Sequence, residues 1–237
     1  FIAFDVQIGD SWLKVPDVIV HHHWKGQDKA PRNFKLMRMM LEEDPDDLRT
    51  VLTMAHQFYA ARDWPHAVEW YTRFYKDRRG LPLERWMAMG YAARSLREMG
   101  RIDEAMKLDN AAVVDHPDLA DGYLGLADCY LARGEYEKAI EWTKNAMTKA
   151  LPDDLLFVDY LDVTFRPYVQ LALAYSALGR LEEAIEACNT ALEVRPQDKK
   201  VLAILDLCNA ALPRKRAVAA YTALAPSLSD SERVRVA

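Results

Sequence analysis

The sequence has little of what usually points to nucleic acid, membrane or metal as the main partner. Its 31 lysine and arginine residues are fewer than its 36 aspartate and glutamate residues and form no block, whereas phosphate binding needs clustered positive charge. No apolar run reaches the ~18 residues of a membrane span, and no signal-peptide pattern is present. The three cysteines (Cys129, Cys188 and Cys208) lack metal-ligand spacing, so we interpret them as reduced core thiols of a cytoplasmic protein.

Recognisable catalytic motifs are also missing. The sequence contains no phosphate-binding Walker loop, no dinucleotide fingerprint and no serine-centred nucleophile elbow. His56, His66 and His116 stand alone within helical patterns, and we interpret them as packing or surface residues. Catalytic residues therefore remain unknown. What the 237 residues do have is a hydrophobic fraction of 51%, which is enough to bury a sizeable core.

A repeat occupies the middle of the chain. In four segments a small residue, expected at a close contact between helices, is followed twelve positions later by a second one in the next helix. These pairs are Ala55 with Ala67, Ala93 with Ala105, Ala127 with Ala139, and Ala172 with Ala184. The turn between the two helices carries a glycine in three segments, where a left-handed residue commonly ends a helix: Gly100, Gly134 and Gly179. Asp63 marks the corresponding turn in the first segment.

This pattern resembles the tetratricopeptide repeat (TPR). The interval from Ala105 to Ala139 is 34 residues, which is the period of that family. The preceding interval is 38 residues and the following one 45, so we expect two insertions, the longer around "DDLLFVDYLDV". The resemblance implies a mainly α fold, in which antiparallel helix pairs stack into a superhelix. We assign four TPR-like repeats with insertions to residues 48–196.

The segments on either side continue the helical phase. Residues 30–47 are predicted to form a connecting helix or half-repeat that ends at Pro45. Residues 197–226 are predicted to form a degenerate capping helix pair, broken at Pro213, because terminal repeats are usually atypical. Residues 227–237 are predicted to be a polar tail.

Residues 1–29 differ in kind. "FIAFDVQIG" and "WLKVPDVIVHHHW" are rich in β-branched residues and predict two strands joined by a short hairpin. A two-stranded hairpin is marginal alone. We therefore assign these strands to the end of a preceding α/β domain, and expect the chain to be part of a longer protein.

The order of these segments resembles bacterial and phage glycosyltransferases of the family-two type, in which a GT-A nucleotide-sugar domain precedes such repeats. The resemblance implies a divalent metal, Mn or Mg, that neutralises the departing diphosphate. It also implies that a histidine at the end of the catalytic core helps an upstream Asp-x-Asp motif to hold that ion. The candidates are His21, His22 and His23, and only one is expected to reach the ion because strand neighbours point to opposite faces. The alternative is that all three are polar strand-end residues.

The main functional prediction is the C-terminal TPR region of a nucleotide-sugar-dependent glycosyltransferase, which recruits the acceptor or a partner protein. By itself the chain lacks the donor-binding motif and should be inactive. The alternative is a non-enzymatic TPR scaffold for protein–protein interaction, and a third possibility is self-association.

A concave partner-binding face is expected along the first helix of each pair. Counting in register places on it Arg49, Leu52, His56, Tyr59, Met87, Arg94, Arg97, Asp121, Leu124, Asp128, Arg166 and Val169. Within this set, Arg94 and Arg97 would form either a small anion-binding patch or part of a solvated helix face.

Overall fold

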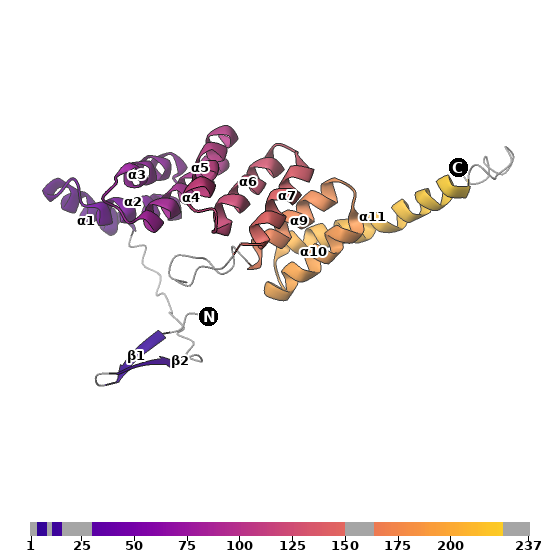
Figure 1. Cartoon of the computed structure of the whole chain (residues 1–237), viewed down its shortest axis with the longest axis horizontal. Helices are drawn as coiled ribbons and strands as arrows, with labels where there is room; N and C mark the ends of the chain where they lie inside the picture. The colour runs from indigo at the N-terminus through magenta and orange to yellow at the C-terminus, as the bar shows by residue number, and fades with distance from the viewer. Residues whose placement is uncertain (1–3, 9–10, 16–29, 150–163, 225–237) are drawn as a thin grey trace.

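The computed structural model describes residues 4–8, 11–15, 30–149 and 164–224, and most of them lie in ten helices (Figure 1). Eight helices form four antiparallel pairs in the order of the predicted repeats. The pairs are α2 (Leu48–Ala60) with α3 (Trp64–Lys76), α4 (Pro82–Glu98) with α5 (Ile102–Asp115), α6 (Ala120–Ala132) with α7 (Tyr136–Met147), and α9 (Arg166–Ala177) with α10 (Leu181–Val194). The predicted mainly α array is therefore confirmed.

The predicted alanines hold the pairs together. All eight have no exposed surface, and each lies in a different helix of the array: Ala55, Ala67, Ala93, Ala105, Ala127, Ala139, Ala172 and Ala184. A side chain of one methyl group lets two helix backbones approach closely, and burial at every one of these positions confirms the register of the repeat.

Left-handed residues make the turns within the pairs. Gly100 and Gly134 have φ of 73° and Gly179 has φ of 68°, a region that glycine enters without steric cost. In the first pair this place belongs to Arg62, with φ of 58°, and not to the predicted Asp63. Asp63 follows in the same turn and caps α3, because its carboxylate accepts a hydrogen bond from the backbone N–H of His66, the third residue of that helix.

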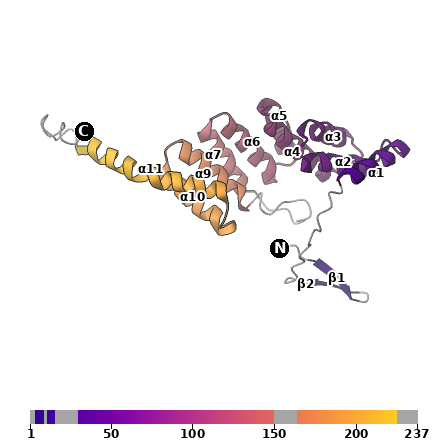
Figure 2. The same ribbon diagram turned by 180° about the vertical axis from the view of Figure 1, so that it is seen from behind.

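Two layers result from the stacking of the pairs. The first helices α2, α4, α6 and α9 contact one another in succession, whereas the second helices chiefly contact their neighbours in the chain. The first helices therefore form the inner layer and the second helices the outer layer. The pairs follow one another along the long axis of the molecule, as the two opposite views show (Figures 1 and 2). The main-chain path thus brings residues from three or four repeats onto one inner face.

The helix α1 (Ala30–Glu43) stands before the first pair, as the predicted half-repeat requires. It packs on α2 through Phe34, whose ring centroid lies 4.8 Å from that of Phe58, and through the buried side chain of Met37.

At the other end the prediction of two helices broken at Pro213 is wrong. A single helix, α11 (Lys199–Leu224), runs through Pro213 and extends away from the body (Figure 1). Proline removes one N–H donor, but the alanine, leucine, lysine and arginine residues around it are strong helix formers. Lys215 links α11 to the turn between α9 and α10 by donating a 2.8 Å hydrogen bond to the carbonyl oxygen of Gly179.

Two short strands precede the helices. β1 (Phe4–Ile8) pairs antiparallel with β2 (Ser11–Val15), with Ile8 opposite Ser11. The part of the chain that the structure describes contains no further strand, so the predicted assignment of this hairpin to a larger α/β domain gains no support. Residues 16–29, the insertion around "DDLLFVDYLDV" and the tail at 227–237 lie outside the described residues.

A candidate partner-binding face on the inner helices

The inner face divides into two regions that use equivalent repeat positions differently. Relative to the small residue of each first helix, the next position holds His56 in α2, Arg94 in α4 and Asp128 in α6. The position six residues before the small residue holds Arg49, Met87, Asp121 and Arg166 in successive first helices. The N-terminal part of the face is therefore mainly aromatic, and the middle is mainly ionic.

An aromatic cluster, made of His56, Tyr59, Tyr71 and Tyr91, joins α2, α3 and α4. Tyr71 is completely buried, its ring stacks on Tyr91 at 5.4 Å, and its hydroxyl lies 2.7 Å from Nδ1 of His56. Tyr59 meets Tyr91 edge to face at 5.0 Å. His56, Tyr59 and Tyr91 each keep part of their surface exposed. Burial lowers the pKa of His56, so this region presents neutral, rigid rings.

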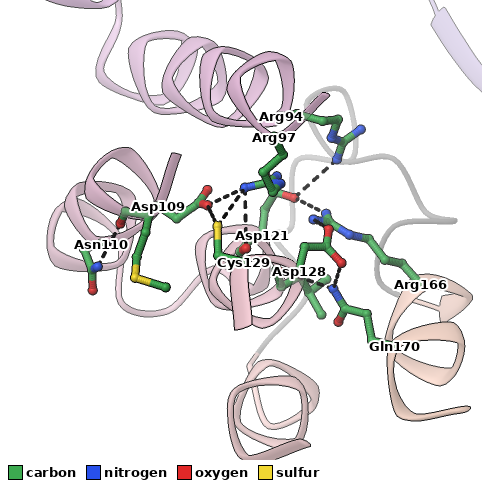
Figure 3. A network of polar contacts seen from close by, with 12 residues as sticks. Arg94, Arg97, Asp109, Asn110, Asp121, Asp128, Cys129, Arg166 and Gln170 are labelled. Atoms are coloured by element: carbon green, nitrogen blue, oxygen red, sulfur yellow. Dashed lines mark hydrogen bonds and ion pairs between the residues drawn. The ribbon is translucent and has the colours of Figure 1, made fainter. Parts of the chain in front are cut away.

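In the middle, an Arg–Asp network ties α4, α6 and α9 together (Figure 3). Arg166 of α9 contacts two aspartates of α6, with its Nη1 3.0 Å from Oδ1 of Asp121 and its Nη2 2.7 Å from Oδ2 of Asp128. Arg94 of α4 lies 3.7 Å from the same Asp121 oxygen. Burial raises the pKa of Asp128, but Arg166 and Arg97 outweigh it, and hydrogen bonds lower the pKa further. The charges of the inner face are thus matched across repeats.

Gln170 extends this network into the core. Its amide nitrogen donates to the backbone oxygen of Leu124 at 2.8 Å and to Oδ1 of Asp128 at 2.6 Å. Its amide oxygen accepts from the hydroxyl of Thr143 at 3.1 Å. A buried amide whose donors and acceptor are both used fixes how α9 sits on α6 and α7.

A buried ion pair joins α4 to α5. Arg97 donates to Asp109, and these side chains are only 10% and 2% exposed. Burial raises the pKa of Asp109 to about 7, against the attraction of Arg97. Cys129 contacts the same carboxylate, with its Sγ 3.5 Å from Oδ2. Room for the carboxylate comes from Gly125, because a Cβ there would lie 2.3 Å from Oδ1 of Asp109.

These contacts remove two residues from the predicted open face and bear on the predicted anion-binding patch. Leu124 is completely buried and Arg97 nearly so, because the first packs in the core and the second reaches Asp109, so neither lines an open face. Both guanidinium groups already face carboxylates, Arg97 that of Asp109 and Arg94 that of Asp121, so the anion-binding interpretation gains no support from these contacts and stays a prediction. Arg49 is exposed, whereas Leu52, Met87 and Val169 are half-buried.

Sequence reasoning missed Asp109 and Gln170. Asp109 does leave a signal, because it stands four residues after Ala105 and three before Ala112, on the buried stripe of α5. An acidic residue at such a position predicts a buried basic partner. Gln170 leaves no comparable signal, since glutamine is common on solvated helix faces.

The predicted metal ligands His21, His22 and His23 lie outside the described residues. Among the residues that are described, no group of three or more His, Cys, Asp or Glu side chains is placed to hold a metal ion. The described helices also include none with the length and apolar character needed to cross a membrane.

Paired helices with small contact residues and left-handed turns, repeated four times, define an α-solenoid of helix–turn–helix repeats. The tetratricopeptide repeat family matches residues 52–120, 92–152 and 166–198, which together cover more than half of the chain. The chain belongs to this family. Among curated proteins, none matches the sequence.

Solved structures agree on the fold. A thermophilic TPR protein of Thermus thermophilus is 22% identical, with 76% of this chain and 90% of that one covered and a TM-score of 0.54. A TPR protein of Parabacteroides merdae is 12% identical, with 82% and 72% covered and a TM-score of 0.56. The second TPR domain of human RPAP3, solved with an HSP70 peptide, is 20% identical, with 49% and 88% covered and a TM-score of 0.40. The first two likenesses show the fold and not the partner.

Proposed function

We propose that the chain is a scaffold for protein–protein interaction, and that it binds an extended segment of a partner protein on the aromatic cluster. One observation carries this proposal. On the same inner layer, the charges of the middle are satisfied by one another, whereas the aromatic residues His56, Tyr59 and Tyr91 of α2 and α4 are each partly exposed.

The chemistry of this region favours a segment with apolar or aromatic side chains. Tyrosine offers a large contact area with few rotatable bonds, and such residues carry much of the binding energy at protein interfaces. Leu52 and Met87, both half-buried, precede His56 and Tyr91 by four residues and so extend the apolar surface along α2 and α4. Arg49 is exposed on α2, near Leu52, and would favour an acidic residue in the bound segment.

The test starts from peptides displayed on phage and selected on the full chain. For each selected peptide, the affinity is measured by titration calorimetry with the native chain and with Tyr59→Ala. Loss of an interface tyrosine should weaken binding roughly tenfold or more. Tyr136→Ala is the matched control, since Tyr136 is a half-buried tyrosine of the outer helix α7. Equal losses in both variants, or full affinity in Tyr59→Ala, would count against the proposed site.

The glycosyltransferase assignment stays a prediction, together with the Mn or Mg ion and the cytoplasmic location. It is carried by the order of the segments and by the three adjacent histidines, and neither the family match nor the solved structures give evidence of a glycosyltransferase domain. A direct test is Mn²⁺ binding by the chain and by the single substitutions His21→Ala, His22→Ala and His23→Ala. Selective loss in one variant would support a ligand role, and unchanged binding in all three would remove it.

A further inference from the structure

The helix α1 carries a group of exposed apolar side chains besides those that pack on α2. Its inner side meets α2 through Phe34 and the buried Met37. Leu36, Met39 and Met40 are each 49% exposed, and Met40 lies at the edge of this group, where its Sδ is 3.9 Å from Oγ1 of Thr50 in α2. Their spacing of three and four residues places them side by side on one stripe of the helix. Large exposed apolar side chains grouped in this way mark a surface that is covered by a partner.

The ends of this stripe carry opposite charges. Arg32 precedes Leu36 by four residues, and Glu43 follows Met39 by four and Met40 by three, so both lie on the same helix face. Both are exposed, and neither makes an ion pair within the described residues. The order along the direction of α1 is therefore basic, apolar, acidic.

Such an order is complementary to itself when two copies run antiparallel. When the two helices are aligned so that Leu36 lies opposite the partner's Met39, Arg32 lies opposite the partner's Glu43 at one end. The two-fold axis repeats that pair at the other end, as a closed isologous interface requires. We infer that α1 is a homodimerisation surface, whose occupant is the α1 helix of a second copy of this chain.

Two further observations favour this occupant. Methionine adapts its shape to an irregular surface. Beside Met39 lies a hollow with two aromatic and three charged side chains around it: Phe34, Phe58, Lys35, Arg38 and Glu42. The exposed apolar residues of α11, at the other end of the array, offer a poorer surface. Arg214 stands between Leu207 and Val218 on one face of that helix.

Dimerisation through α1 leaves the inner face open, because α1 packs on α2 and takes no part in the contacts among the first helices. A single pair of crossing helices buries less than the roughly 1,600 Å² of a standard interface, so the dimer should be weak and should dissociate on dilution. The expected behaviour is a monomer–dimer equilibrium that a bound partner segment does not abolish.

Sedimentation velocity of the full chain over a dilution series tests the inference. Met39→Glu should weaken dimerisation roughly tenfold or more, because it would bury an unpaired charge at the centre of the interface. Met147→Glu is the matched control, since Met147 is 42% exposed on α7 and far along the chain. It should leave the equilibrium unchanged, and thermal unfolding should show that both variants stay folded.

Charge reversal tests the antiparallel register itself. Arg32→Glu and Glu43→Arg should each remain monomeric when alone, since each brings like charges together at both ends. An equimolar mixture of the two variants should dimerise again, because every pair across the interface then joins opposite charges. A native chain that is monomeric throughout, growth beyond the dimer, or no recovery in the mixture would each overturn the inference.

Discussion

The aromatic and ionic regions of the inner face show how one repeat register serves two purposes. In α2 the position after the small residue holds His56, which packs against Tyr71 and Tyr91. In α4 the same position holds Arg94, which pairs with Asp121 of the next first helix. The histidine belongs to a partly exposed aromatic cluster that a partner could contact. The arginine instead joins one repeat to the next. Equivalent positions in a solenoid are therefore not equivalent sites.

The largest expected effect lies where the ionic region is most buried. Asp109→Ala would leave the guanidinium of Arg97 buried without its carboxylate, and removing one member of such a pair typically costs about 3–5 kcal/mol of the free energy of unfolding. Denaturant unfolding measures this loss. The control is Asp103→Ala, which removes an exposed partner of Arg133 and should change stability far less. Similar losses in both would show that burial does not distinguish the two pairs.

The pH dependence of stability should reveal the same carboxyl group. Its pKa is about 7 in the fold and 3.8 ordinarily, so the folded chain binds more protons than the unfolded chain between these values. The contribution of Asp109 is therefore complete below pH 3.8 and is lost as the pH rises through 7. Asp109→Asn should remove this decline. Other carboxylates titrate in the same range. The quantity to compare is therefore the difference in the free energy of unfolding between the native chain and the variant at each pH.

A smaller loss is expected from filling the space beside the ion pair. Gly125→Ala places a methyl group against the Asp109 carboxylate and should destabilise the chain by about 1–3 kcal/mol. Gly90→Ala is the matched helical control, because its Cβ would meet only Oδ2 of Asp121, at 2.9 Å, whereas a Cβ at Gly125 would lie within 2.8 Å of three atoms of Asp109. There the better helix propensity of alanine, about 1 kcal/mol, should offset the contact. Equal effects would mean that α5 and α6 are less tightly packed than the structure indicates.

The smallest effect tests the aromatic region. Tyr71→Phe keeps the ring stack but removes the hydroxyl that lies 2.7 Å from His56, at a cost of about 0.5–1.5 kcal/mol. Because the imidazole loses its hydrogen-bond partner, its orientation toward Tyr91 should loosen, and the chemical shifts of the His56 ring protons should report this. Unchanged shifts would indicate that stacking alone positions the histidine.

The sequence predicts the architecture well because its signals are local. A small residue at a helix contact and a glycine at the following turn act within a dozen positions, so the register of all four pairs can be read directly. Arg62 shows the limit, since the left-handed residue keeps its place seven positions after the small residue but is not a glycine, so the usual signal is missing there. Pro213 shows another, because strong helix formers on both sides outweigh the break that proline usually signals.

The network could not be predicted in the same way. Whether Arg94 faces water or a carboxylate depends on which residue of the next pair stacks beside it, and Asp121 is 27 positions away in the sequence. Superhelical stacking decides this juxtaposition, and helix periodicity alone contains no information about it. Counting in register therefore found most residues of the inner face. It could not distinguish the charged residues that pair with one another from the aromatic residues that stay partly exposed.

The continuous helix α11 has a mechanical consequence. At 1.5 Å per residue its 26 residues span about 39 Å, so a tilt of ~10° at its root would swing the far end by ~7 Å. Val201, Ile204 and Cys208 bury the first half of α11 in the core with α9 and α10. Further along, Lys215 and Arg216 lie 3.7 Å from the carboxylate of Glu182 on α10 and add exposed contacts that help to hold the helix at this angle. Because these ion pairs are exposed, salt should weaken them without melting the helix. The direction of the far end of α11 should then vary more.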